Sequence, residues 1–187
     1  MDVAKELESP LEEPEPDPIL DYHLSLMWLT ENMGGDTKPL TNQFFTLALM
    51  DDVEPRGIGS ALLKGCAHLD ASHLDSVLSI FDQHGAWEHP FNVGYAFIRI
   101  LKSSPDSPAR LAEAGRLSSK NVKQCILTSF TEAGWFPDEL KTWVLALCSD
   151  PDPDNSSHAL ACASMKADLA GDITPLIHAG MHSKLWW

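Results

Sequence analysis

Apolar residues recur along this sequence every three or four positions, which is the spacing of one face of an α-helix. No segment alternates apolar and polar residues in the manner of a strand. The spacing therefore predicts an all-α chain of about nine or ten helices, each of about 10 to 15 residues. The apolar groups are Leu20, Leu24, Met27 and Trp28; Leu74, Val77, Leu78 and Phe81; Val93, Phe97, Ile100 and Leu101; and Leu140, Trp143, Val144 and Leu147.

Glycines and prolines separate the helical segments. Gly85 and Gly134 each follow an apolar segment, where a helix is expected to end. Pro39, Pro90 and Pro137 lie at or just before expected helix starts. A proline at that position breaks no hydrogen bond, because the first N–H groups of a helix have no partner within it.

The chain also resembles itself when it is shifted by 98 residues without a gap. The matches are Leu29 with Leu127, Thr30 with Thr128, Pro39 with Pro137, Leu47–Leu49 with Leu145–Leu147, Asp52 with Asp150, and Pro55 with Pro153. The segment between them, 76–106, has the same order of helix, glycine, proline and second helix. These similarities predict internal repeats.

Each such segment is followed by a short helix rich in small residues, around Ala61, Ala109 and Ala159, which are 48 and 50 residues apart. The expected unit is three helices in about 49 residues, the size range of armadillo and HEAT units, and the architecture is similar to those arrays. Residues 173–187, with Gly180 as the glycine, make a partial fourth unit, so about three and a half units are expected. The alternative is an irregular helical bundle.

Charge divides the chain into two regions. Residues 1–18 hold seven acidic residues, four prolines and only Lys5 as a base, a composition that predicts a disordered acidic tail. Residues 19–187 are expected to form a single helical repeat domain. The whole chain carries 27 acidic and 13 basic residues, a formal net charge of −14. This balance argues against nucleic acid as a partner and favours a basic protein.

The amino terminus has neither the features of a secretory signal nor those of a transit peptide, so the cytoplasm or the nucleus is expected. No apolar run approaches the length that crosses a bilayer, which predicts no membrane contact. Cys66, Cys125, Cys148 and Cys162 stand singly in apolar segments. They are expected to be buried free thiols and not disulfides or zinc ligands.

No catalytic motif occurs in the sequence. His178 and His182 are four residues apart, and His68 and His73 share one connection with Cys66, but neither group has the convergent ligands that zinc requires. We therefore predict no catalytic residue, no metal and no cofactor, and whether the chain is an enzyme stays open, with the balance against it.

Trp87 and Trp135 follow Gly85 and Gly134 at equivalent positions, and Trp186 lies near the corresponding position in the last unit. Each tryptophan either covers the end of its helix pair or belongs to a binding ridge, since tryptophan is enriched at binding hot spots. Acidic residues at the same turns, Glu132 among them, would give the ridge a negative rim. The predicted partner-binding residues are Trp87, Trp135, Trp186, Trp187, Glu88, Asp138 and Glu139.

The sequence thus favours a non-enzymatic protein-binding module, an adaptor or regulatory subunit with an acidic surface that contains tryptophan. One alternative is a helical enzyme that depends on a small ligand or a metal, or a small-ligand binder, with its site at histidines between the helices. Another is a structural subunit that forms an oligomer through the C-terminal Trp186 and Trp187.

Overall fold

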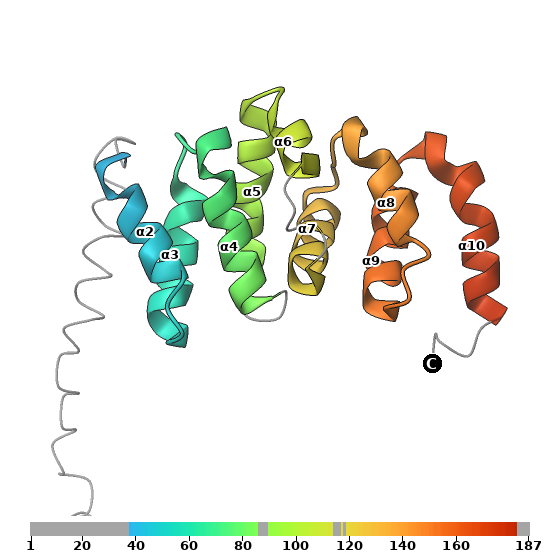
Figure 1. The fold of residues 1–187 in the computed structure, drawn as a ribbon, viewed down its shortest axis with the longest axis horizontal. Helices are drawn as coiled ribbons and strands as arrows, with labels where there is room; N and C mark the ends of the chain where they lie inside the picture. Colours follow the sequence, from blue (N-terminus) through green and yellow to red (C-terminus); the bar gives the residue numbers. More distant parts are fainter. Residues whose placement is uncertain (1–37, 86–89, 114–116, 118, 183–187) are drawn as a thin grey trace, which may run out of the picture.

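The computed structural model of the chain describes residues 38–85, 90–113, 117 and 119–182 (Figure 1). All regular elements in these ranges are helices, and no strand occurs among them. The predicted all-α class is therefore confirmed. The expected acidic tail of residues 1–18 and the expected helix around Leu20–Trp28 lie outside the described residues.

The described part of the chain contains nine α-helices, several of them preceded by one turn of 3₁₀-helix. The α-helices are α2 (Thr41–Ala48), α3 (Val53–Gly65), α4 (Leu74–His84), α5 (Pro90–Ser103), α6 (Ser107–Glu113), α7 (Lys120–Ala133), α8 (Lys141–Leu147), α9 (Pro153–Ser164) and α10 (Ala170–His182). The 3₁₀ turns are η2 (Lys38–Leu40), η3 (Ala71–His73), η5 (Asp138–Leu140) and η6 (Ala167–Leu169). Helices α2, α6 and α8 are shorter than expected, at 8, 7 and 7 residues.

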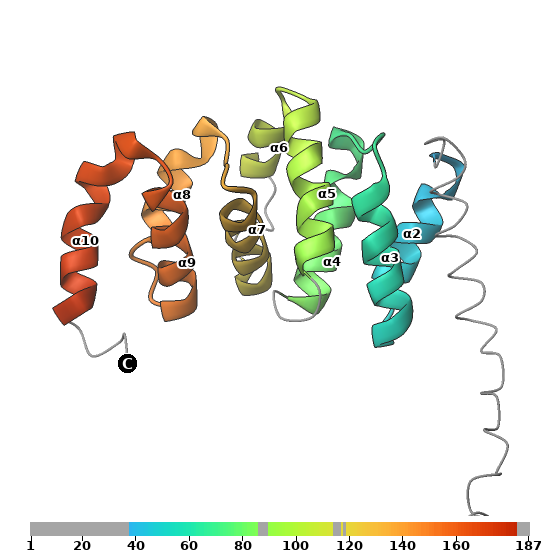
Figure 2. The same ribbon diagram turned by 180° about the vertical axis from the view of Figure 1, so that it is seen from behind.

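The helices stand side by side in chain order along the long axis of the molecule (Figure 1). Seen from one side, α2, α4 and α8 lie in front of α3, α5 and α9, and the view from behind reverses that order (Figure 2). Helix α5 packs against both α3 and α7, and α9 packs against α7, α8 and α10. The result is an elongated stack two helices deep.

The layers do not follow the expected three-helix unit of about 49 residues. In that unit, α2, α5 and α8 are each the second helix, the one that follows the glycine and the proline, so they should occupy equivalent places. Helix α5, however, lies in the opposite layer from α2 and α8 (Figures 1 and 2). The helices group instead as antiparallel pairs such as α2–α3 and α8–α9, whose members pack on each other. Which helices pair is decided by packing across the stack, and the sequence similarity alone did not reveal it.

The core contains a line of phenylalanines that crosses the stack. Phe81 in α4, Phe97 in α5, Phe130 in α7 and Phe136 after α7 are each at most 1% exposed. Their successive ring centroids are 5.5, 5.9 and 5.7 Å apart, the range in which aromatic rings attract one another. This line connects three helices to the loop that follows α7.

Two of the three glycines expected to end helices do so. Gly85 and Gly134 follow α4 and α7 with φ angles of 69° and 58°, a conformation that glycine adopts without the steric cost that other residues incur. Gly180 does not end its helix, because α10 continues to His182. A glycine inside a helix is tolerated when neighbouring turns continue the hydrogen-bond ladder, so glycine alone was an unreliable stop signal.

Candidate functional site

An open groove lies where the C-terminal end of α5 and the start of α6 face the loop between α7 and α8. Its volume is ≈ 580 Å³, within the usual size range of ligand sites. Its wall combines aromatic rings, prolines and charged side chains: Leu101, Lys102, Ser104, Pro105, Pro108, Trp135, Phe136, Pro137, Asp138, Glu139 and Lys166.

The end of α7 determines how Trp135 enters this groove. Gly134 adopts the left-handed conformation, and the backbone N–H of Trp135 donates to the carbonyl of Phe130 at 3.2 Å. This is the usual way in which a glycine ends a helix and reverses the chain. After the reversal, Phe136 is 0% exposed in the core, while Trp135 is only partly buried against it.

Two lysines from distant parts of the chain lie over the aromatic rings of the groove. The Nζ of Lys102, in the last turn of α5, is 4.6 Å from the centroid of the Trp135 ring. The Nζ of Lys166, just after α9, is 4.7 Å from the centroid of the Phe136 ring. Both distances are in the cation–π range, so the rings of this groove bind ammonium groups.

The charges at the rim are of both signs. Oδ1 of Asp138 is 2.7 Å from Nζ of Lys166 and 3.3 Å from Nζ of Lys141. Lys141 also lies 2.6 Å from Asp168. The hydrogen bond from Lys166, followed by that from Lys141, lowers the pKa of Asp138. The rim is therefore less negative than the acidic residues alone suggest, and the carboxylate of Asp138 already has two lysine partners.

The structure brings together three of the predicted partner-binding residues, Trp135, Asp138 and Glu139, on one groove. Glu139 is exposed there. The other four, Trp87, Glu88, Trp186 and Trp187, lie outside the described residues. Sequence reasoning missed the groove's two lysines. The only sequence feature that could have pointed to these lysines is their position at or just after the C-terminal end of a helix, where basic residues are generally favoured.

Two of the histidines considered as ligands, His68 and His73, hold local structure. His68 Nε2 lies 2.5 Å from the hydroxyl of Thr41, and His73 Nδ1 lies 3.1 Å from the carboxylate of Asp70 in a capped turn. Within the described residues, no three His, Cys, Asp or Glu side chains are grouped so that they could hold a metal ion.

The four cysteines are buried free thiols, as predicted. Burial raises the pKa of Cys125 to about 12 and those of Cys148 and Cys162 to about 11. A thiol of such high pKa is a poor nucleophile at neutral pH. These residues serve as small apolar side chains of the core.

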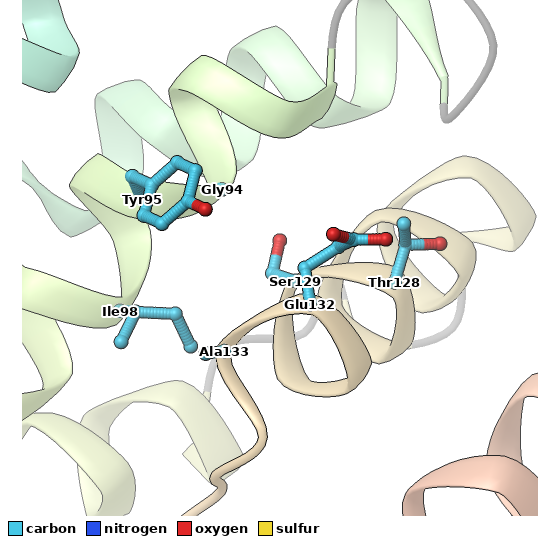
Figure 3. Close-up of a pocket in the computed structure, with 7 residues that line it drawn as sticks. All are labelled: Gly94, Tyr95, Ile98, Thr128, Ser129, Glu132 and Ala133. Carbon is cyan, nitrogen blue, oxygen red and sulfur yellow. The ribbon is translucent and has the colours of Figure 1, made fainter.

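A second, much smaller pocket lies between α5 and α7 (Figure 3). Gly94, Tyr95 and Ile98 on α5 face Thr128, Ser129, Glu132 and Ala133 on α7. Its volume of ≈ 10 Å³ is about the space of one water molecule. The hydroxyl of Thr128 is buried there without a hydrogen-bond partner among the described residues. This pocket is too small for a substrate.

None of the protein-family models, curated proteins or solved structures compared with the chain matches it. In the part of the chain that the structure describes, no helix has the length and apolar character needed to cross a membrane.

Proposed function

We propose that this chain is a non-enzymatic protein-binding module, and that it holds its partner in the groove around Trp135. The observation that carries the proposal is the convergence of Trp135, Asp138 and Glu139 with Lys102 and Lys166 on one open groove. A half-buried tryptophan beside polar groups is a typical binding hot spot. The groove also lies where helices meet a loop, a usual location for binding residues.

The chemistry of the groove suits a partner segment that carries an arginine or a lysine. The Trp135 ring already has the ammonium of Lys102 over it, so it can accept a cation of the partner when the flexible Lys102 side chain moves aside. Glu139 offers an exposed carboxylate at the same rim. The net charge of −14 of the whole chain adds long-range attraction for a basic segment.

The proposal includes a helical repeat architecture, with the pair of helices as its unit. Helices α2, α4, α6 and α8 begin at residues 41, 74, 107 and 141, so every second helix starts 33, 33 and 34 residues after the one before. The internal similarity at 98 residues is close to three such intervals, which place the start of α8 100 residues after the start of α2. Such arrays present extended surfaces and suit protein binding. In this proposal residues 19–187 form one domain, and 1–18 an acidic tail.

A peptide library displayed on phage tests the groove. Selection on the full chain is expected to enrich sequences that contain arginine or lysine, and the synthetic peptides are then measured by calorimetry. Trp135→Ala is expected to weaken their binding at least tenfold, and Glu139→Gln to weaken it several-fold.

Tyr95→Ala is the matched control. Tyr95 is an exposed aromatic residue with the Nζ of Lys64 4.6 Å from its ring centroid, which is the same arrangement outside the groove. Equal loss of affinity with Trp135→Ala and Tyr95→Ala would contradict the proposed site. Enrichment of acidic peptides would contradict the proposed partner chemistry.

A further inference from the structure

The connection between α5 and α6 contains two Ser-Pro dipeptides, Ser104-Pro105 and Ser107-Pro108. The backbone N–H of Ser107 donates to the carbonyl of Ser104 at 3.1 Å. The N–H of Asp106 donates to the Ser104 hydroxyl oxygen at 3.4 Å. The segment is therefore a tight turn, and Ser104, Pro105 and Pro108 contribute to the wall of the groove.

The two serines differ in access. Ser107 is 0% exposed at the first position of α6, so an external active site reaches it only if α6 unfolds. Ser104 is partly exposed, and its neighbours Ser103, Pro105 and Asp106 are exposed. A protein kinase binds its target segment in extended form, and surface turns open more easily than packed helices. Ser104 is thus the accessible serine of the pair.

Two further Ser/Thr-Pro dipeptides occur in the chain, Ser9-Pro10 and Thr174-Pro175. Thr174 lies in α10, and its hydroxyl donates to the Ala170 carbonyl at 2.6 Å, so helix and hydrogen bond both protect it. Ser9 lies outside the described residues and has to be removed by substitution in any test.

The surroundings of Ser104 favour an added negative charge. Lys102 and Lys166 line the same groove, and a phosphate group carries about two negative charges at neutral pH and pairs well with lysine. Lys102 now lies over the Trp135 ring, and Lys166 is bound to Asp138. A phosphate at Ser104 would draw both ammonium groups toward itself, against the like charges of the nearby Asp106 and of Asp138 and Glu139, which line the same groove.

We propose that Ser104 is a phosphorylation site for a proline-directed protein kinase, and that the phosphoserine closes the groove by binding Lys102 and Lys166. In the reaction, the Ser104 hydroxyl oxygen attacks the γ-phosphorus of ATP held by the kinase. The bond from that phosphorus to the bridging oxygen breaks, ADP leaves, and the catalytic base of the kinase takes the serine proton. The second part of this proposal, that the phosphoserine closes the groove, rests on the proposed function. The first part, that Ser104 is phosphorylated, does not.

The first experiment treats the full chain carrying Ser9→Ala with a cyclin-dependent kinase and ATP. Intact mass and fragment spectra are expected to show one phosphoryl group, placed on Ser104 and not on the adjacent Ser103. Ser104→Ala and Pro105→Ala are expected to abolish it, and Ser107→Ala to leave it unchanged. Modification of Ser107, of Thr174, or of no residue between 103 and 108 would overturn the site.

The second experiment follows the phosphate by ³¹P NMR during a pH titration. Pairing with the lysines is expected to move its pKa below the usual value of about 6, and the Lys102→Gln/Lys166→Gln double variant to restore that value. Lys64→Gln, outside the groove, is the control. A phosphate that titrates identically in all three proteins would overturn the pairing.

The third experiment compares binding of the selected peptides before and after phosphorylation. At least tenfold weaker binding is expected, and equal affinity would overturn the closing of the groove. If the library selects no peptide, the proposed function fails while the first two experiments still decide the phosphorylation site.

Discussion

A Cβ atom added to Gly59 of α3 would lie 2.4 Å from the backbone nitrogen of Ala48 in α2. The two helices cross closely at this point because Gly59 has no side chain. Gly94 of α5 plays a milder form of the same role, since an added Cβ would lie 2.7 Å from the hydroxyl oxygen of Ser129 in α7. The stack therefore depends on small residues at specific crossings.

Alanine substitutions at three glycines are expected to change the free energy of unfolding by different amounts, in a fixed order. Gly59→Ala opposes backbone atoms and should cost the most, at the upper end of the about 1–3 kcal/mol typical of overpacking. Gly94→Ala should lower the free energy of unfolding less, by about 1–2 kcal/mol, because it opposes the end of a side chain and not backbone, although Ser129 must then give up its hydrogen bond to the Cys125 carbonyl. Gly57→Ala, with nothing within 4 Å, should stabilise the helix by up to about 1 kcal/mol. Urea unfolding measures all three. Destabilisation by Gly57→Ala equal to that by Gly59→Ala would contradict the packing argument.

Adjacent aromatic residues at the groove should differ in their contribution to stability. Phe136→Ala is expected to lower the free energy of unfolding by about 3–5 kcal/mol, because it opens a cavity beside Phe130. Trp135→Ala should lower it by only about 1–2 kcal/mol, since its side chain is partly exposed. Thermal unfolding of both variants checks this difference. If Trp135→Ala lowered the free energy of unfolding more than Phe136→Ala, the role of Trp135 would be purely structural.

The connection between α8 and α9 should contribute to acid sensitivity. Hydrogen bonds, first from the backbone N–H of Asp152 and then from Lys123, lower the pKa of Asp150 below its ordinary value of 3.8. A lowered pKa stabilises the fold above the unfolded-state pKa, and that stability is lost as the pH falls through the folded-state value. Asp150→Asn should therefore lower the melting temperature at about pH 6 and make no difference at about pH 2.

The control for this titration is Asp172→Asn on the exposed surface of α10. It is expected to lower the melting temperature less than Asp150→Asn does at about pH 6, because Asp172 is exposed and only its place in the first turn of the helix favours its charge. If the melting temperature of Asp150→Asn is still below that of the unsubstituted chain at the lowest pH, lost packing, and not charge, explains the effect.

The thiols of the folded protein should not react with a disulfide reagent at about pH 8, because all four are buried and burial raises the pKa of Cys125, Cys148 and Cys162. All four cysteines are expected to react once denaturant unfolds the chain. Absorbance of the released thiolate counts the reacted groups in each state. A fast-reacting thiol in the native state would show that at least one cysteine is more accessible than its burial indicates.

Helix positions could be predicted because they depend on local spacing. Val77, Leu78 and Phe81 recur at helical intervals, and all three are buried as that spacing requires. The pairing of helices could not be predicted in the same way. It depends on crossings such as Gly59 against Ala48, whose residues are unremarkable in the sequence.

For the candidate site too, the residues that are close together in the sequence could be predicted, and those that come from distant parts of the chain could not. Trp135, Asp138 and Glu139 stand together after a helix-ending glycine, so the sequence pointed to them. Lys102 reaches the same groove from α5, and Lys166 reaches it from the connection after α9. No local pattern connects residues so far apart in the chain. Three-dimensional packing alone gives Trp135 its cationic neighbour.

The order of the helices in space has a consequence for synthesis of the chain. Because the elements follow one another along the stack in chain order (Figure 1), each pair finds its packing surface on a pair that has already left the ribosome. Contacts close in sequence form quickly, and domains generally fold from the amino terminus as they emerge. Folding of this protein can thus be vectorial, with α10 docking on α9 after the helices before it are in place.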